Sequence, residues 1–356
     1  MRHRILILRL GAIGDVVRTI PVVEALRKEY RSAHIAWAVE PKSVDVLSGN
    51  PAIDELVVFE RAPVCDGSIR QRVSGTLRNV AAFVSFVRTL RRKRFDCVLD
   101  FHGIFKSGLA GWLSGAPERI GYSRAYSKEL NSLFTNRRVS PGGRRISRFE
   151  KNACLLAAVT RNPPETDATI YVPDRNKEEV DRLLAERRGA GNNKLVVVHC
   201  ATSRPLKQWP TEYYARTCDT LVGQGLDVVL TCGTGEEGIR DEIRSLMNEG
   251  SIIINTPSLK HYAWLVKRAD VYFGGDTGPM HIASAMGTPV VAVFGPTDPV
   301  VVGPYRQPYK VLWKKLDCSP CNERGCKRNI ECMRSIPPEE ATAAILELLE
   351  GTREGE

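Results

Sequence analysis

Short apolar runs alternate along nearly the whole chain with segments whose apolar residues recur every three or four positions. Runs rich in Val, Ile and Leu are typical of buried parallel strands, and the longer period is that of helices packed on a sheet. Pro21 falls inside the first helical pattern and is expected to kink it. In the first half the pattern predicts strands at 4–8, 34–39, 55–59 and 96–100, and helices at 15–31, 73–92 and 105–113.

The alternation resumes in the second half without a strong internal sequence repeat. It predicts strands at 194–199, 227–231, 252–255, 271–273 and 290–294, and helices at 211–222, 237–247, 259–267, 278–286 and 337–349. Between 123 and 143 the regularity fades, and Ser, Asn and a Pro-Gly-Gly triplet predict a long loop. We therefore expect an α/β protein with two doubly wound parallel sheets, in domains 1–185 and 194–336 joined by a Gly- and Asn-rich linker at 186–193.

Length and composition agree with a soluble protein of two cores. The chain has 356 residues, of which 43% are hydrophobic and 26% charged. No stretch approaches the apolar length of a membrane-spanning helix, and the run at 5–8 is too short for a signal peptide. We expect a cytoplasmic protein, in which the ten cysteines are thiols or metal ligands rather than disulfides.

The net charge of +10 is unevenly spread. Nine basic residues and only two acidic ones lie between Arg119 and Lys151, and a second basic cluster lies at 88–94. Such surfaces concentrate anionic partners, which include nucleic acid, an anionic membrane and a phosphorylated substrate. For the run at 91–94, a solvated charged face is the simpler interpretation.

A glycine-rich turn follows the first strand and contains Gly11, Gly14 and Asp15. Glycines let the backbone approach a ligand closely. Asp15 has two interpretations: it caps the helix that begins there, or it is a general base that removes a proton from an acceptor hydroxyl.

Two segments in the second half have the residue types of a phosphate site. At 199–210, the hydroxyls of Thr202 and Ser203 precede Lys207, whose charge suits a leaving diphosphate. At 273–281 a helix begins just after an aspartate, and free N–H groups at a helix start favour an anion. The second segment supplies Asp276 for sugar hydroxyls, Gly278 for close approach, and Thr277 and His281, although a buried core histidine is the rival interpretation of His281.

The segment 233–238 matches G-x-G-x-x-G but not the context of a dinucleotide fingerprint. It follows the second strand of its domain, and two glutamates stand where the pyrophosphate would lie. Glu236 or Glu237 could instead bind ribose hydroxyls.

Cys318, Cys321, Cys326 and Cys332 form a cluster near the C-terminus. Four cysteines at such spacing can make a tetrahedral zinc site, so a structural zinc is one interpretation. Reduced thiols and oxidation-prone pairs are the others. Catalysis through these cysteines is not expected, because no histidine stands beside them in the sequence.

Three of these motifs together resemble glycosyltransferase family 9, the bacterial lipopolysaccharide heptosyltransferases. They are G-x-x-G-D-V-x-x-T-x-P at 11–21, H-x-x-T-S-R-x-x-K-x-W-P at 199–210, and the G-G-D-T-G-x-x-H segment at 274–281 with its continuation to 297. The resemblance implies a GT-B fold of two Rossmann-like domains with a cleft between them, and a last helix, within 337–356, that packs back on the first domain. It also implies metal-independent, inverting transfer of L-glycero-D-manno-heptose from ADP-heptose to Kdo–lipid A or an already heptosylated core.

The same resemblance implies roles for individual residues. Asp15 would be the base, and Glu236 or Glu237 would meet the ribose. The acceptor would lie at the inner face of the cytoplasmic membrane, against the basic loops of the first domain, and Gly14, Lys106, Arg119 and Arg124 are acceptor candidates by position only. Ala12-Ile13 replaces the serine-containing turn of some members, which puts contacts from that turn in doubt. The donor would be held by Thr202, Ser203, Lys207, Asp276, Thr277, Gly278 and His281.

Two alternatives stay open. One is a GT-B transferase of another nucleotide sugar. The other is a zinc-stapled nucleic-acid-binding protein, which should interleave many aromatic residues with its basic ones. The region 119–151 has only four aromatic residues, so we expect no nucleic-acid partner.

Overall fold

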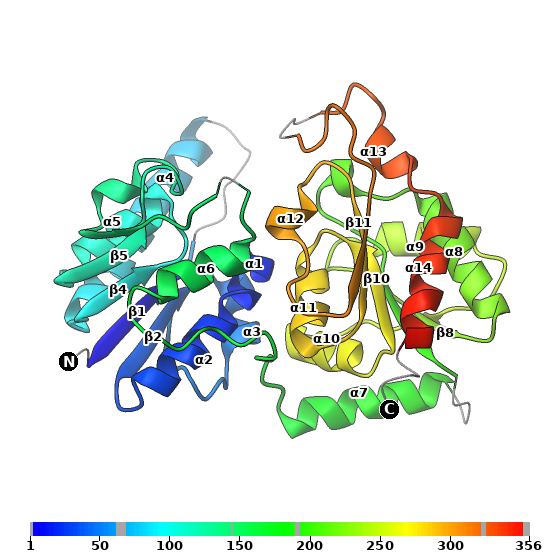
Figure 1. Cartoon of the computed structure of the whole chain (residues 1–356), viewed down its shortest axis with the longest axis horizontal. Coiled ribbons are helices and arrows are strands. Elements are labelled where there is room, and N and C mark those ends of the chain that lie inside the picture. The colour runs from blue at the N-terminus through cyan, green and yellow to red at the C-terminus, as the bar shows by residue number, and fades with distance from the viewer. Residues whose placement is uncertain (1–2, 62–68, 144, 189–192, 322–324, 352–356) are drawn as a thin grey trace. The chain divides into compact units, whose positions relative to one another are not determined.

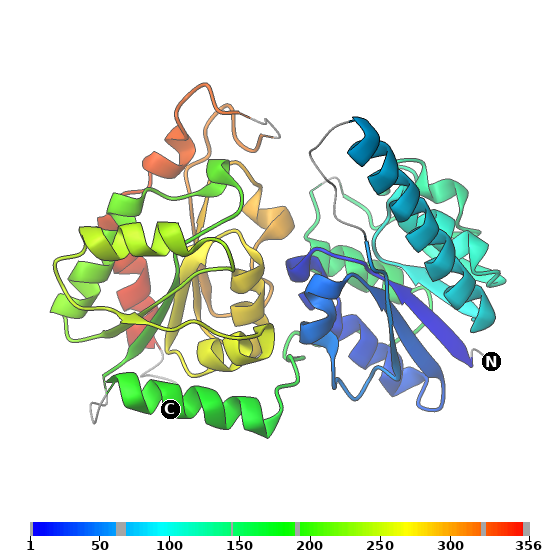
Figure 2. The ribbon, with the colours of Figure 1, turned by 180° about the vertical axis from the view of Figure 1, so that it is seen from behind.

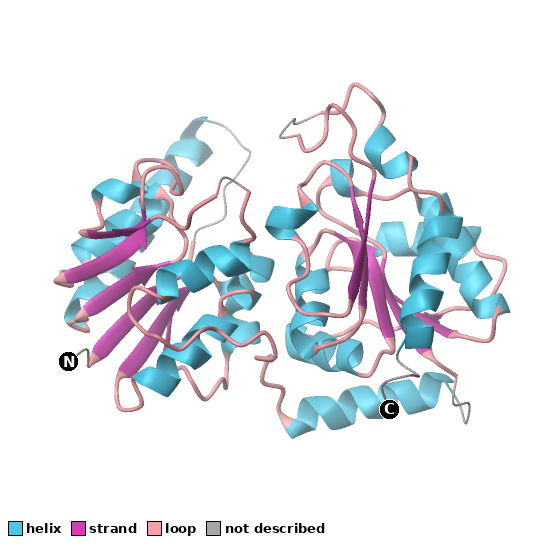
Figure 3. Ribbon diagram, viewed as in Figure 1, coloured by secondary structure: helices cyan, strands magenta, loops and turns pink. Residues whose placement is uncertain are grey.

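The structure is a computed structural model that describes residues 3–61, 69–143, 145–188, 193–321 and 325–351. The chain forms two compact units, Met1–Tyr171 and Val172–Glu356 (Figure 1). In each unit a parallel sheet has helices on both faces (Figure 3). Such sheets are buried on both sides, which explains the continuous apolar runs in the sequence.

The first unit contains a six-stranded sheet in the order β3-β2-β1-β4-β5-β6. Its helices include the long α4, which covers one face of this sheet together with α5 (Figure 2). The strands are β1 (Arg4–Leu8), β2 (His34–Val39), β3 (Glu55–Val58), β4 (Cys97–Asp100), β5 (Glu118–Tyr122) and β6 (Arg137–Val139). The helices are α1 (Ile13–Val17), α2 (Ile20–Glu29), α3 (Val44–Leu47), α4 (Ile69–Arg92), α5 (Phe105–Leu113) and α6 (Arg148–Leu156), with short 3₁₀ turns η1 (Pro41–Ser43) and η2 (Asn131–Leu133).

The second unit contains a six-stranded sheet in the order β12-β11-β10-β7-β8-β9. The strands are β7 (Leu195–His199), β8 (Asp227–Thr231), β9 (Ile252–Ile253), β10 (Val271–Gly275), β11 (Val290–Phe294) and β12 (Tyr309–Trp313). The helices are α7 (Asp174–Arg188), α8 (Thr211–Gly223), α9 (Glu237–Leu246), α10 (Leu259–Lys267), α11 (Gly278–Met286), α12 (Pro299–Val302), α13 (Glu331–Arg334) and α14 (Pro338–Gly351), with the 3₁₀ turn η3 (Pro205–Lys207).

Both sheets have the strand order 3-2-1-4-5-6 of a Rossmann fold, when the strands of each unit are numbered along the chain. In the second unit this order is read from β9 to β12. The order reverses between β1 and β4 in the first unit and between β7 and β10 in the second. Ligands of such sheets bind outside the carboxyl ends of the strands at this switch point. These two edges are therefore where the site residues should lie.

Most predicted elements are confirmed, including the central strands of both sheets. The single kinked helix at 15–31 is wrong: α1 ends at Val17, and α2 begins at Ile20 with Pro21 in its first turn. A proline is tolerated there because the first N–H groups of a helix have no partner within it. The predicted loop at 123–143 contains β6 and η2. The elements that were not predicted are β5, β12, α3, α6, α7, α12 and α13.

The division of the chain differs from the predicted one. The boundary between the units lies at Tyr171 and Val172. Helix α7 packs on α10 within the second unit. It includes the first three residues of the linker expected at 186–193, and residues 189–192 lie outside the described residues. The C-terminal helix α14 belongs to the second unit. It lies against α8 in the second unit, where Ala341, Ile345 and Leu349 enter the core (Figure 1).

Candidate active site

Asp15 lies in the first turn of α1, just beyond the carboxyl end of β1. No side chain caps α1, so helix capping is not the role of Asp15. Its carboxylate instead meets three guanidinium groups. Arg18 Nη2 donates to Oδ1 at 2.5 Å, Arg148 Nη1 lies 2.5 and 2.6 Å from the two oxygens, and Arg9 Nη2 forms a third ion pair.

These arginines determine how basic Asp15 is. Burial of the carboxyl group opposes ionisation, but the charges of Arg9, Arg18 and Arg148 outweigh it and hold the pKa of Asp15 far below its usual range. The side chains of Arg9 and Arg18 are 11% and 4% exposed, whereas that of Arg148 is 41% exposed. Arg148 is thus the partner that a ligand can reach from solvent.

The turn after β4 brings a histidine to the same edge. Asp100 fixes this turn by accepting hydrogen bonds from the backbone of His102 and Gly103 and from Ser107 and Asn131. Burial, assisted by the charges of Arg9 and Lys106, lowers the pKa of His102 to about 3. Its Nδ1 is buried without a hydrogen-bond partner among the described residues, so His102 is a neutral group with an unused polar atom at the switch point.

The acceptor candidates of the first unit lie in different positions and have different partners. Lys106 Nζ pairs with Glu40 Oε1 at 2.8 Å, and Gly14 is buried in α1 beside Asp15. Arg124 is exposed just after β5. Arg119 lies near the amino end of β5, where its guanidinium donates to the carbonyls of Phe134 and Ala116. The sheet thus places Lys106, Gly14 and Arg124 toward the carboxyl edge but not Arg119.

Four further residues lie in this candidate site and were not predicted from the sequence: Arg9, Arg18, His102 and Arg148. Arg148 had a local signal that could have been used. Ser147 and Glu150 form a capping box, in which Ser147 Oγ accepts from Glu150 N and the Glu150 carboxylate accepts from Ser147 N. That box predicts a helix whose first residue is Arg148, but not that this residue reaches Asp15.

In the second unit, the three predicted donor segments meet at adjacent strand ends. The register pairs Gly274 of β10 with His199 of β7, and His199 with Thr231 of β8. The loop 200–207, the start of α11 and the loop 232–236 follow these three residues. Parallel pairing therefore brings to one edge segments that are far apart in the sequence.

Lys207 and Asp276 are in direct contact at this edge. Lys207 Nζ forms an ion pair with Asp276 Oδ2, and Thr297 Oγ1 donates to the same oxygen at 2.8 Å. The side chains of Lys207 and Asp276 are only 14% and 8% exposed. Lys207, the residue predicted to bind the diphosphate, is thus already paired with the Asp276 carboxylate.

Helix α11 begins beside this ion pair. Thr277 is its N-cap but forms no side-chain capping bond, and Gly278 and Pro279 follow in the first turn. A Cβ at Gly274 would lie 2.6 Å from Tyr272 Oη and 2.9 Å from the His199 carbonyl, so only glycine fits where β10 ends. Gly274 thus makes room for the Tyr272 ring, and the first turn of α11, whose free N–H groups favour an anion, follows directly beyond β10.

The remaining donor candidates surround this edge. Thr202 Oγ1 accepts from Arg204 N at 3.2 Å, Ser203 is exposed, and His281 is 3% exposed in α11. Glu236 accepts from Gly233 N at 3.0 Å and closes its own loop. Glu237 is exposed at the start of α9, and hydrogen bonds from the backbone of Glu237 and Gly235 lower its pKa.

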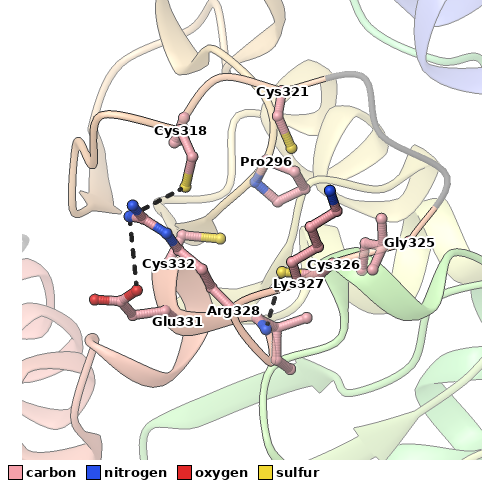
Figure 4. A pocket seen from close by; sticks show the side chains of 12 residues that line it. Pro296, Cys318, Cys321, Gly325, Cys326, Lys327, Arg328, Glu331 and Cys332 are labelled. Carbon is pink, nitrogen blue, oxygen red and sulfur yellow. Dashed lines mark hydrogen bonds and ion pairs between the residues drawn. The ribbon is translucent and has the colours of Figure 1, made fainter.

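The four C-terminal cysteines line a cavity of about 370 Å³ beside Leu206 and Pro296 (Figure 4). Cys326 Sγ accepts a hydrogen bond from Ile330 N at 3.2 Å, and Arg328 Nη1 lies 3.8 Å from Cys318 Sγ. Within the described ranges, no three His, Cys, Asp or Glu side chains are placed to hold a metal ion. The thiols surround the cavity rather than converge on one point, so the arrangement does not fit the structural zinc site that the spacing suggested.

In the part of the chain that the structure describes, none of the helices has the length and apolarity needed to cross a bilayer.

Comparison with known proteins identifies the family. The model of glycosyltransferase family 9 (heptosyltransferase) matches residues 83–330. Lipopolysaccharide heptosyltransferase 1 of Pseudomonas aeruginosa is 25% identical over 91% of this chain and 87% of its own. The crystal structure of a family 9 glycosyltransferase from Veillonella parvula superposes with a TM-score of 0.81, at 22% identity, over 98% and 97% of the two chains.

A second solved structure is the Escherichia coli heptosyltransferase WaaC with ADP-2-deoxy-2-fluoro heptose, which superposes with a TM-score of 0.71 at 22% identity over 97% and 99% of the chains. These structures share the two Rossmann-like units of the GT-B fold. The family match covers more than half of the chain, including the segments at the ends of β7, β8 and β10 that were predicted to hold a donor. The chain belongs to glycosyltransferase family 9 and is a glycosyltransferase of the GT-B fold.

Proposed function

We propose that the protein transfers L-glycero-D-manno-heptose from ADP-heptose to the Kdo–heptose inner core of lipopolysaccharide, with inversion at the anomeric carbon. The observation that carries the proposal is the meeting of Lys207, Asp276 and the start of α11 at the switch point of the second unit. The lipopolysaccharide heptosyltransferase among its relatives and the ADP-heptose analogue bound to WaaC support this choice of donor.

The donor diphosphate would lie at the start of α11, where the helix dipole favours negative charge. There it would take over Lys207 from Asp276. Asp276 would keep its hydrogen bond from Thr297 and turn its other oxygen to hydroxyls of the sugar. Thr202 and Ser203 would add hydroxyl donors to the phosphates, and Glu236 or Glu237 would bind the ribose.

In the reaction, the acceptor hydroxyl oxygen attacks the anomeric carbon while the bond from that carbon to the diphosphate oxygen breaks. Lys207 and the start of α11 stabilise the charge that builds on the leaving ADP. The hydroxyl proton passes to Asp15.

Three arginines make Asp15 a weak base, so it accepts this proton only after the new bond is largely formed and the oxygen has become strongly acidic. The proton transfer is therefore late in the reaction. His102 is neutral and lies at the same strand edge as Asp15, so it can form a hydrogen bond to the acceptor without adding charge.

The acceptor would lie on the basic carboxyl edge of the first unit. Its sugar carboxylates and phosphates suit Arg148, Lys106 and Arg124, which are partly or fully exposed there. Because this acceptor is a lipid, the enzyme would work as a cytoplasmic protein in peripheral contact with the inner face of the cytoplasmic membrane.

The test is ADP release from ADP-heptose with two acceptors, Kdo–lipid A and its mono-heptosylated form, with the product mass measured in parallel. We expect release and a mass gain of one heptose with one acceptor, which also assigns the addition step. ADP-glucose and a UDP-sugar are the control donors. Faster turnover of a control donor would favour a GT-B transferase of another nucleotide sugar.

A further inference from the structure

The first unit has an exposed apolar surface that the proposed reaction does not use. Of the eleven large hydrophobic side chains exposed in the described chain, seven lie on α4, on α5 or next to η2. They are 40% to 67% exposed. These seven residues, which we call the apolar face, are Leu77, Val80, Val84, Phe105, Trp112, Leu130 and Leu133.

The apolar face belongs to one layer of the unit. Helices α4 and α5 contact each other on the same side of the sheet (Figure 2). On α4, Leu77, Val80 and Val84 recur at helical spacing along one side, while Phe86 and Leu90 point into the core.

On α5, two aromatic side chains of the apolar face join through a third. The ring centroids of Phe105 and Trp112 lie 5.3 and 6.3 Å from that of Phe134. Phe134 directly follows η2, and α5 and η2 are in contact, so the exposed side chains of the two elements lie in the same part of the unit.

Positive charge continues the α4 stripe. Arg88 and Arg91 follow Val84 on the same side of the helix, and both are exposed. Helices that combine an apolar side with arginines are typical of proteins that lie in a membrane interface. Arginines near such a surface attract anionic lipids and repel a second copy of the same basic face.

The apolar face also adjoins the candidate acceptor site. Phe105 is the first residue of α5, next to Lys106 and three residues after His102. An acceptor held in a bilayer by its acyl chains presents its sugars at headgroup depth, so an enzyme must bring its acceptor edge to that depth.

We propose that the apolar face, with Arg88 and Arg91, docks the protein on an anionic membrane surface and so positions the acceptor edge of the first unit at the lipid headgroups. Peripheral membrane contact is already part of the proposed function, and the role of this docking in catalysis rests on that function. The assignment of the docking surface to α4, α5 and η2 is independent of which sugar is transferred.

The test is sedimentation of the full-length protein with vesicles of phosphatidylglycerol and phosphatidylethanolamine, and with vesicles of phosphatidylcholine. We expect binding to the anionic vesicles, and about tenfold weaker binding by the Leu77→Glu/Val84→Glu variant, because both substitutions put charge on the buried side of the contact. Arg88→Ser/Arg91→Ser should weaken binding about fivefold per arginine, and only for the anionic vesicles. Leu246→Glu/Val300→Glu is the matched control, since these residues are 47% and 48% exposed in the second unit.

Activity separates this proposal from the proposed function. With a deacylated acceptor in solution, the α4 variants should turn over as fast as the native protein, whereas with the acceptor in vesicles they should be slower. Equal vesicle binding by the native protein and the Leu77→Glu/Val84→Glu variant would overturn the docking surface. So would equal losses in the matched control, or a dimer that the α4 substitutions dissociate while vesicle binding persists. Absence of turnover with both acceptor forms would refute the proposed function and leave the vesicle result to decide the docking surface.

Discussion

Replacing Asp15 with asparagine should destabilise the first unit as well as stop the reaction. The Asp15 carboxylate balances three guanidinium groups, and its side chain is 12% exposed. Asparagine keeps the shape but leaves the buried charges of Arg9 and Arg18 without an anion. Breaking a buried ion pair by removing one partner costs about 3 kcal/mol or more. For a unit of this size, that loss lowers the thermal midpoint by roughly 6–12 °C.

Arg148 provides the internal control, because it contacts the same carboxylate from a partly exposed position. Solvent screens its side chain, which is 41% exposed, so Arg148→Gln in the native background should cost only about 0.5–1 kcal/mol. In the Asp15→Asn background the same substitution removes one of three mutually repelling charges and should stabilise the protein. The effect of Arg148→Gln therefore changes sign between the two backgrounds.

Urea unfolding of the native protein, the two single variants and the double variant measures this coupling. The pKa of Asp15 lies below its unfolded value of about 3.9, so its stabilisation is fully present above that pH and is lost only as the pH falls through the folded pKa. The difference between the native protein and Asp15→Asn should thus be constant between pH 5 and 8. Two results would contradict a stabilising role of the Asp15 carboxylate among these arginines. One is unfolding of Asp15→Asn at the native urea concentration, and the other is an equal effect of Arg148→Gln in both backgrounds.

Three further predictions concern the second unit. Lys207→Gln should weaken ADP binding about tenfold, because a charge-assisted contact to the diphosphate is lost. Calorimetry measures the dissociation constant, with a substitution of the exposed Lys267, Lys267→Gln, as the control. An unchanged dissociation constant for Lys207→Gln would remove Lys207 from the site. Burial lowers the pKa of His199 to about 4, below its unfolded value of about 6.5, so stability should fall by roughly 3 kcal/mol as the pH drops between these values. Unfolding measured at several pH values checks this slope, which His199→Gln should flatten; an equal slope in the variant contradicts it. Cys318 and Cys326 are exposed, whereas Cys200 and Cys218 are buried and have raised thiol pKa values. Brief alkylation, followed by mass spectrometry, should therefore modify Cys318 and Cys326 but not Cys200 and Cys218. Modification of Cys218 in the folded protein would contradict this packing.

The sequence predicted the central strands because they are buried on both faces and therefore continuously apolar. Strands β1, β7 and β10 are of this kind. The missed strands β5 and β6 contain charged residues and lie toward one edge of their sheet, where one or both sides of a strand can face solvent. Edge strands of this composition have no apolar run to detect.

The site was predictable where its residues form contiguous motifs and not where distant segments meet. The three segments predicted to hold the donor could be proposed because each combines a strand end, a glycine or hydroxyl residue and a helix start. Arg148 lies 133 residues from Asp15, and no local pattern indicates that the two are in contact. The cysteine spacing suggested zinc, but the path of the loop sets the sulfur positions, and spacing alone does not determine that path.

Single-turnover heptose transfer should be measured with the native protein and with Asp15→Asn, each saturated with ADP-heptose, on Kdo–lipid A and on its mono-heptosylated form. We expect transfer by the native protein to one of the two acceptors. We also expect Asp15→Asn to be about a thousandfold slower, with its affinity for ADP-heptose unchanged. Transfer by Asp15→Asn within tenfold of the native rate would contradict the role of Asp15. Failure of the native protein with both acceptors would contradict heptose transfer to the lipopolysaccharide core.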